Sequence, residues 1–251
     1  MKMLNVLLLA ICFLLTARMP AQTQEPKKEN SVPVKSNQVQ SMAYQLDGRA
    51  LDERFVELFS STNRNKGYKG TPYLFEEWKM GSLIKTGGDT IPNLELAYDV
   101  YEGELICQVK NAKAVLLDPG QVHSFFMRDG EEQLYYERHL IDGASRFLRT
   151  YPLGKGFNIY ALQSKTVRQA NNTPYGTSQY HEYVDKPEIL YLRLGEGAPL
   201  QKVERNKKKF LELMGEYAGE VERYMKIEGL KQTKLEDLKK LIAYVAQVSQ
   251  D

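Results

Sequence analysis

Apolar and polar residues alternate with a period of two through much of the segment between residues 70 and 203. In one clear example, Leu94, Leu96, Tyr98 and Val100 are separated by single intervening residues. Successive side chains of an extended chain point to opposite faces, so these four residues share one face. The alternation predicts β-strands with one buried face over this part of the chain.

Short turn sequences separate these predicted strands. Asp-Gly at 129–130 and Glu-Gly at 102–103 each predict a tight hairpin. In Asp-Pro-Gly at 118–120, proline presets φ at the first turn position, and glycine is expected to take the positive φ of a type II turn. Connections this short cannot contain helical crossovers, so we expect an antiparallel sheet.

The period becomes helical near the C-terminus. Two apolar stripes predict two amphipathic helices joined as an αα-hairpin. Their members are Phe210, Met214, Tyr217, Val221 and Tyr224, then Leu235, Leu238, Ile242 and Val245. Gly229 is expected to end the first helix in a left-handed conformation, and Thr233 with Glu236 to form a capping box for the second. Gly215 and Gly219 indicate a bend or a close packing contact in the first helix.

These patterns together predict an α+β fold. Its main part would be an antiparallel β-sheet, in the form of a curled sheet, a sandwich or a barrel. A short N-terminal helix is expected at 50–62, where apolar residues recur at helical spacing, after a strand around 42–46. We assign residues 41–205 to a β-rich domain and residues 206–251 to a C-terminal helical hairpin packed on that domain.

The first residues have the pattern of a secretory signal peptide. Lys2 precedes an apolar run at 4–17 that is too short to span a bilayer and is followed by small residues. We expect a signal peptide at 1–21 and a disordered leader at 22–40, which lacks aromatic residues. The chain is therefore predicted to be exported, to the periplasm or beyond, with no membrane span after cleavage. Lipidation at Cys12 is disfavoured because the apolar run continues past it.

Export also changes the charge and cysteine arguments. The chain has 34 basic and 32 acidic residues, and loss of Lys2 and Arg18 with the signal peptide leaves 32 of each. A net charge near zero gives no electrostatic basis for nucleic-acid binding. Cys107 would be the only remaining cysteine, which excludes an intramolecular disulfide and a cysteine metal site. Its neighbours predict a strand residue that faces the core.

Histidines are the main candidates for chemistry. His123 and His139 lie on the two strands of the predicted 129–130 hairpin, and His181 lies in a long polar segment. Asp118 or Glu137 could complete a metal site, but no metal-binding spacing is present, so we expect neither a metal nor another cofactor. Serine-hydrolase and phosphate-loop motifs are also missing from the sequence, and catalytic residues stay unassigned.

Tyrosines gather near the same hairpin and in the long polar segment. The candidate binding residues are Tyr135, Tyr175, Tyr180, His181 and Tyr183. Exposed tyrosines suit recognition of carbohydrate or protein, because the ring offers area and the hydroxyl a hydrogen bond. The alternative is that the sheet uses these residues at half-buried positions, which tyrosine favours.

The segment "GTPYLFEEWKMGSLIKTGGDTIPNLELAYDVYEGEL" (70–105) resembles the start of a family of uncharacterised secreted bacterial envelope proteins. The shared pattern is Gly-[Ser/Thr]-Pro-Tyr-Leu, an aromatic residue, a glycine and a hairpin, and the similarity continues to the C-terminal helices. The family has no established activity, so the resemblance implies no site residues. From its composition, we expect 70–83 to be a structural plug with Tyr73, Phe75 and Trp78 buried.

The leading functional hypothesis is a non-enzymatic envelope protein that acts through binding or assembly. Its partner would be an envelope protein or a polysaccharide. One alternative is a hydrolase of envelope polymers with a site near His123, His139 and His181. Another is a carrier of a lipid or small ligand, if the sheet closes around a cavity.

Overall fold

The computed structural model describes residues 44–46, 49–51, 56–58, 67–108, 114–154, 156–170 and 180–249. The predicted signal peptide (1–21) and leader (22–40) lie outside these residues. Of the segment expected to be helical at 50–62, only residues 50–51 and 56–58 are described, and these are β-strand. The strand expected around 42–46 is present as β1 (Tyr44–Leu46), which pairs with β2 (Arg49–Leu51).

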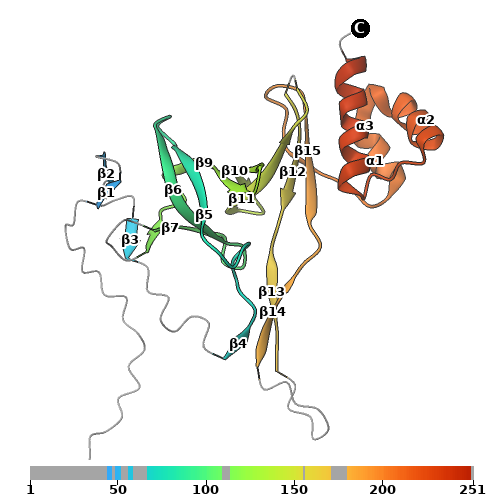
Figure 1. The fold of residues 1–251 in the computed structure, drawn as a ribbon. Helices are drawn as coiled ribbons and strands as arrows, with labels where there is room; N and C mark the ends of the chain where they lie inside the picture. The colour runs from blue at the N-terminus through green and yellow to red at the C-terminus, as the bar shows by residue number, and fades with distance from the viewer. Residues whose placement is uncertain are drawn as a thin grey trace, which may run out of the picture. The chain divides into compact units, whose positions relative to one another are not determined.

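Eleven of the described strands form one open sheet, in the order β16-β15-β12-β11-β10-β9-β5-β6-β7-β8-β3 (Figure 1). Every pairing within it is antiparallel. The strands are β3 (Val56–Leu58), β5 (Lys79–Lys85), β6 (Thr90–Asp99), β7 (Glu104–Gln108), β8 (Val115–Leu117), β9 (Val122–Asp129), β10 (Glu132–Ile141), β11 (Ala144–Pro152), β12 (Phe157–Leu162), β15 (Ile189–Leu194) and β16 (Gln201–Lys202). The predicted α+β fold with a mainly antiparallel sheet is confirmed, and the sheet does not close into a barrel.

A second, smaller sheet has three strands in the order β13-β14-β4. Its strands are β4 (Tyr68–Lys69), β13 (Lys165–Arg168) and β14 (His181–Asp185). β14 pairs with β13 in the antiparallel sense and with β4 in the parallel sense. This sheet places the end of the long polar segment, at His181 and Glu182, beside Tyr68 and Lys69, which precede the main sheet strand β5.

The predicted hairpins form where the turn residues indicated. Asp129 lies opposite Glu132 in the β9–β10 pair, and Gly130 has a φ of 60°. The turn at 118–120 also forms, with Gln121 N donating to Asp118 O at 3.0 Å, but the type II prediction is wrong because Gly120 has no positive φ. The Asp118 carboxylate accepts from Gly120 N at 2.8 Å, which stabilises the turn without a left-handed residue.

One face of β5–β11 builds an aromatic core. The predicted alternation is confirmed, since Leu94, Leu96, Tyr98 and Val100 are all buried. Tyr98 donates its hydroxyl to Phe147 O at 3.2 Å, and its ring packs edge-on against Phe125, Tyr136 and Phe147. Cys107 lies in the same core, as predicted, and burial raises the pKa of its thiol to about 12.

The expected burial of Trp78 is wrong, because 40% of its surface is exposed. In the segment before β5, the side chains that pack against the aromatic core are instead Leu74 and Phe75. Leu74 N donates to Tyr98 O at 2.8 Å, which ties this segment to β6. Trp78 comes just before β5, past the point where the chain turns away from the core.

The C-terminal region has three α-helices where two were expected. They are α1 (Lys207–Met214), α2 (Ala218–Glu228) and α3 (Leu235–Val248), with a 3₁₀ turn at Gly215–Tyr217 between the first two. Gly215 has φ 57° and ψ −123°, which produces the bend that the glycine pair indicated. Gly229 ends α2 in the left-handed conformation, as predicted.

The predicted capping box of the last helix is wrong. Lys234, rather than Thr233, is the N-cap residue of α3, and no side chain caps it. Asp237 accepts instead from the backbone N–H of Lys231, so a first-turn acid of α3 stabilises the preceding loop. An acid in this position is also favoured by the helix dipole.

The C-terminal helices pack on one face of β12 and β15 through α3, which lies beside these strands in Figure 1, and α2 packs against α3. Phe157, Ile159 and Leu192 belong to a single apolar cluster with Phe210 and with Met214. Tyr160, which alternates with Ile159 along β12, is buried on the opposite face with Leu148 and Tyr191. β12 and β15 therefore pack against helices on one face, and on the other face against side chains of the sheet itself.

We predict that Met214→Asp destabilises the protein by at least about 3 kcal/mol, because it buries an unpaired charge in the apolar cluster of the C-terminal helices. Ile227→Asp is the matched control, since Ile227 lies on α2 and is exposed. The control should change stability by no more than about 0.5 kcal/mol. Urea unfolding of both variants tests this, and equal effects would contradict the packing described for α1.

The buried Asp99 carboxylate gives a pH-dependent prediction. Asp99 is only 2% exposed and accepts from Tyr101 N and Glu102 N, and burial raises its pKa from 3.8 to about 6. The folded state therefore binds a proton on the Asp99 carboxylate more tightly than the unfolded state does. Protonated Asp99 favours folding at low pH, and this contribution is lost as pH rises from 3.8 through 6. Relative to Asp99→Asn, the wild type should lose about 2 to 3 kcal/mol between pH 4 and pH 7. A pH-independent difference would contradict this.

Candidate functional site

The face of β5, β9 and β10 opposite the aromatic core presents a different set of side chains. Phe126 lies opposite Ser82 on one neighbouring strand and Tyr135 on the other, and Ser124 likewise lies opposite Ile84 and Glu137. Phe125, one position along, pairs with two residues of the core. The period of two therefore separates a core face from a face that is free to form a site.

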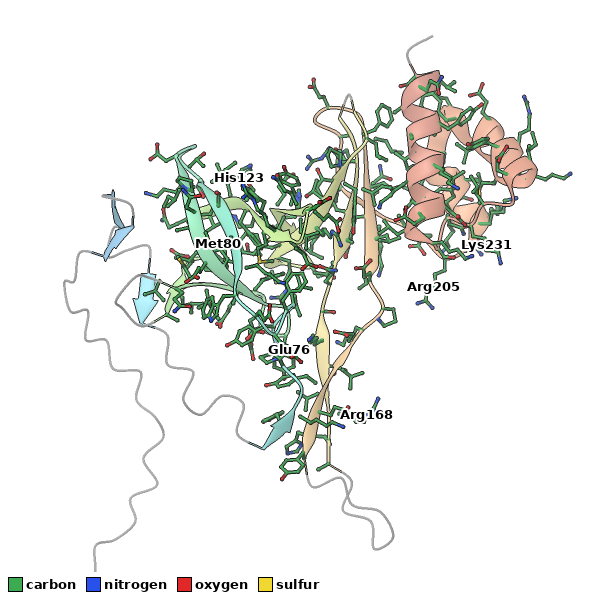
Figure 2. All side chains as sticks on the ribbon, viewed as in Figure 1. Glu76, Met80, His123, Arg168, Arg205 and Lys231 are labelled. Carbon is green, nitrogen blue, oxygen red and sulfur yellow. The ribbon has the colours of Figure 1, made fainter. Side chains whose placement is uncertain are left out.

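A cavity of about 290 Å³ lies on this second face. It is formed by β5, β9, β10 and β11 and the first residue of β6. Its lining residues are Ser82, Ile84, Thr90, His123, Ser124, Phe125, Phe126, Tyr135, Tyr136, Glu137, Thr150 and Pro152. His123 is labelled in Figure 2 near the start of β9, with Met80 of β5 below it in this view. Hydroxyl groups, aromatic rings and one carboxylate thus converge on one cavity.

Two aromatic rings form one side of the cavity. The centroids of Phe126 and Tyr135 are 5.7 Å apart, and 47% of the Tyr135 surface is exposed. Glycine at position 81 lets β5 approach β9 closely, because a Cβ there would collide with the carbonyl oxygen of Phe126. The cavity therefore offers an accessible aromatic surface built on paired strands rather than on loops.

Glu137 connects the cavity to a polar group that we call the Glu137 cluster: Glu137, His139, Tyr160 and Arg193. Tyr160 donates its hydroxyl to Glu137 Oε2 at 3.4 Å. His139 Nε2 lies 3.4 Å and an Arg193 terminal nitrogen 3.8 Å from Glu137 Oε1. The Tyr160 ring packs edge-on against His139 and also contacts the Arg193 guanidinium. Three polar side chains from three strands thus lie around one carboxylate, and of these the Tyr160 hydroxyl donates a hydrogen bond to it.

Strand pairing explains how this cluster assembles. Glu137 and His139 are two residues apart on β10 and so share a face. Tyr160 of β12 lies opposite Thr150 of β11, which lines the cavity on the same face. Arg193 of β15 lies opposite Asn158, whose side-chain amide donates to the Tyr160 hydroxyl at 3.4 Å. The cluster spans four adjacent strands.

Burial sets the charge state of His139. The side chain is 10% exposed, and burial lowers its pKa below 6.5; Arg193 and His123 lower it further, while Glu137 opposes them. Burial also raises the pKa of the Tyr160 hydroxyl, and Glu137 adds to this, so Tyr160 remains a donor. Within the described residues, His139 Nε2 and Arg193 Nε are buried without a hydrogen bond of good geometry. The cluster is therefore polar but incompletely satisfied.

The predicted site residues are divided between two places. Tyr135 lines the cavity, whereas His181 and Tyr183 lie in the three-stranded sheet. There, Tyr68 packs between His181 and Tyr183, with ring centroids 5.1 Å from each. Tyr180 is exposed beside this group, and Tyr175 lies outside the described residues.

The three histidines do not form one site. His123 lines the cavity and is close enough to His139 to affect its pKa, but His181 belongs to the small sheet. Its Nδ1 accepts from the backbone N–H of Ala170 at 3.3 Å. Across the described part of the chain, no group of three or more His, Cys, Asp or Glu residues could hold a metal ion.

The sequence analysis missed Tyr160 and Arg193. Each lies in an ordinary strand with no motif, and their approach to Glu137 depends on the pairing of β10, β11, β12 and β15. Glu137 itself was considered only as a metal ligand. The alternation along β10 could have placed Tyr135, Glu137 and His139 on one face, but it could not show which strands complete that face.

We predict opposite effects of two substitutions on the His139 pKa. Glu137→Gln should lower it, because an attractive negative charge is lost, and Arg193→Gln should raise it. Histidine ring proton shifts, followed by NMR across pH 4 to 8, measure both. Because the folded pKa lies below 6.5, the stabilising effect of neutral His139 is present above 6.5 and is lost as pH falls.

Glu131→Gln is the control for these measurements, since Glu131 lies exposed in the β9–β10 turn. It should leave the His139 pKa unchanged. Shifts of the same sign in Glu137→Gln and Arg193→Gln, or a wild-type pKa above 6.5, would contradict the geometry of the cluster.

Comparison with models of known protein families, with curated proteins and with solved structures finds no match to this chain. The resemblance of residues 70–105 to secreted envelope proteins therefore stays a prediction. The function has to be inferred from the chemistry of the cavity and of the Glu137 cluster.

Proposed function

We propose that this protein is an exported bacterial envelope protein that binds an envelope component, a protein or a polysaccharide, in the cavity of the main sheet. The observation that carries the proposal is the cavity of about 290 Å³, in which the Phe126–Tyr135 ring pair faces solvent beside Glu137. Ligand sites commonly combine aromatic surface with a few fixed polar groups. Export rests on the N-terminal sequence pattern.

The architecture favours a surface binding site over a carrier with an enclosed ligand. The side of the sheet that could enclose a ligand is filled by the aromatic core around Tyr98. The described sheet is open, with β16 and β3 at its ends. The cavity lies on the other face, where a ligand can enter without any strand separating. Among the described residues, no helix is long and apolar enough to span a membrane.

The Glu137 cluster favours a second candidate function, hydrolysis of an envelope polymer. Glu137 lies at the cavity, and His139 and Tyr160 contact its carboxylate. A general base or acid needs such a position beside a bound substrate. A glycosidase of the usual type uses two carboxylates, however, and Glu137 is the only carboxylate among the described lining residues. Binding therefore remains the leading proposal.

Immobilised full-length mature protein tests the binding proposal. Purified envelope polysaccharide and detergent-solubilised envelope protein from the bacterium that encodes it would be applied in turn. We expect one of the two to bind, with an affinity at least about tenfold lower for Tyr135→Ala, because the exposed ring is lost. Leu140→Ala is the control, since Leu140 lies on the same strand and is exposed.

Equal binding by wild type and Tyr135→Ala would refute the role of the cavity. Mass spectrometry of the polysaccharide after overnight incubation distinguishes the hydrolase. Release of fragments by wild type but not by Glu137→Gln would replace the binding proposal with the catalytic one.

A further inference from the structure

We infer that the ligand of this cavity is an uncharged sugar unit of a glycan. The inference rests on the proposed binding function and specifies its ligand. It follows from four properties of the cavity: the pairing of its strands, its aromatic surface, its charge balance and its size.

Strand pairing argues against a peptide bound as an added strand. The cavity lies on β5, β9, β10 and β11, and each of these strands has a hydrogen-bonded neighbour on both sides. Their backbone N–H and C=O groups are used within the sheet, so a peptide cannot extend it at this place. Recognition here must come from side chains.

The side chains on this face suit a sugar ring. The Phe126–Tyr135 pair offers an apolar surface for the C–H face of a pyranose, as amphipathic aromatic rings do at binding sites. Ser82 and Ser124 add hydroxyl groups that can donate and accept hydrogen bonds, and the Thr150 hydroxyl, which donates to Leu148 O at 3.3 Å, can accept one. The Glu137 carboxylate accepts from hydroxyl donors and is held by Tyr160 in a fixed position.

The charge balance indicates an uncharged ligand. Arg193 lies 3.8 Å from Glu137 and offsets its charge, and His139 is neutral above its lowered pKa. No lysine or arginine occurs among the described lining residues, and Arg193 already offsets the charge of Glu137, so the lining offers an acidic sugar no further Lys or Arg cation. An ammonium group at Glu137 would be repelled by Arg193. Neutral hydroxyls avoid both costs.

The cavity size limits how much of the glycan is bound. A volume of about 290 Å³ is at the lower end for ligand pockets, which hold roughly 300 to 1,000 Å³. A cavity of this size suits a short part of a glycan rather than a long chain. The remainder of a longer chain would extend past Tyr135, which is already half exposed.

The test uses full-length mature protein and three pools from bacterial envelopes: neutral glycan, acidic glycan separated by anion exchange, and solubilised protein. We expect the neutral pool to bind and periodate, which cleaves vicinal diols, to abolish the binding. Proteinase treatment should have no effect. Glu137→Gln and Tyr135→Ala should each weaken binding about tenfold or more, as expected for losing a charge-assisted hydrogen bond or a ring contact. Glu131→Gln and Leu140→Ala should bind like wild type.

Three other outcomes would overturn the inference, and each identifies which argument failed. Tyr135-dependent binding of the acidic pool would refute the charge argument. Tyr135-dependent binding of the protein pool would identify a protein partner and refute the glycan, and in both cases the proposed binding function stands. If no pool binds in a Tyr135-dependent manner, the inference and the proposed function both fail.

Discussion

The pairing register of β9 with β10 is the constraint on which the rest of this structure depends. Phe125 opposite Tyr136 belongs to the aromatic core, and Phe126 opposite Tyr135 belongs to the cavity. A shift of one residue would exchange the two sets, because side chains alternate between the faces of a strand. It would bury Glu137 and expose the core aromatics. Packing of the core residues therefore fixes the register, and the register fixes the positions of the cavity residues, although the cavity residues contribute little to the core.

The two faces of the sheet are used differently along its length. Around Tyr98 the core consists mainly of sheet residues in edge-on aromatic contact, with Leu74 and Phe75 packed against them. At β12 and β15 the core is instead formed with the C-terminal helices, which bury Ile159 and Leu192. The opposite face carries the cavity, and toward β12 and β15 it also carries the buried side chains of Leu148, Tyr160 and Tyr191. The cavity and the Glu137 cluster lie on this continuous face.

The Glu137 cluster is an incompletely hydrogen-bonded polar group next to the cavity. Its donors approach the carboxylate at 3.4 to 3.8 Å, and buried nitrogens of His139 and Arg193 lack well-formed hydrogen bonds. Such incompletely satisfied polar groups cost stability in a folded protein. Their position next to a cavity gives them a use that packing alone does not explain. The Tyr68–Tyr183 group, by contrast, makes stacked ring contacts within a small sheet.

Local sequence determined the elements of this protein, and tertiary structure decided the site. The period of two around Leu94 and the left-handed stop at Gly229 depend on nearest neighbours along the chain, so both could be predicted. The burial of Trp78 and the capping box at Thr233 were wrongly predicted, because each depends on what the surrounding chain leaves exposed or hydrogen-bonded. Tyr135 was identified as a candidate from its residue type. Its partners Tyr160 and Arg193 come from distant strands, and only strand order brings them together.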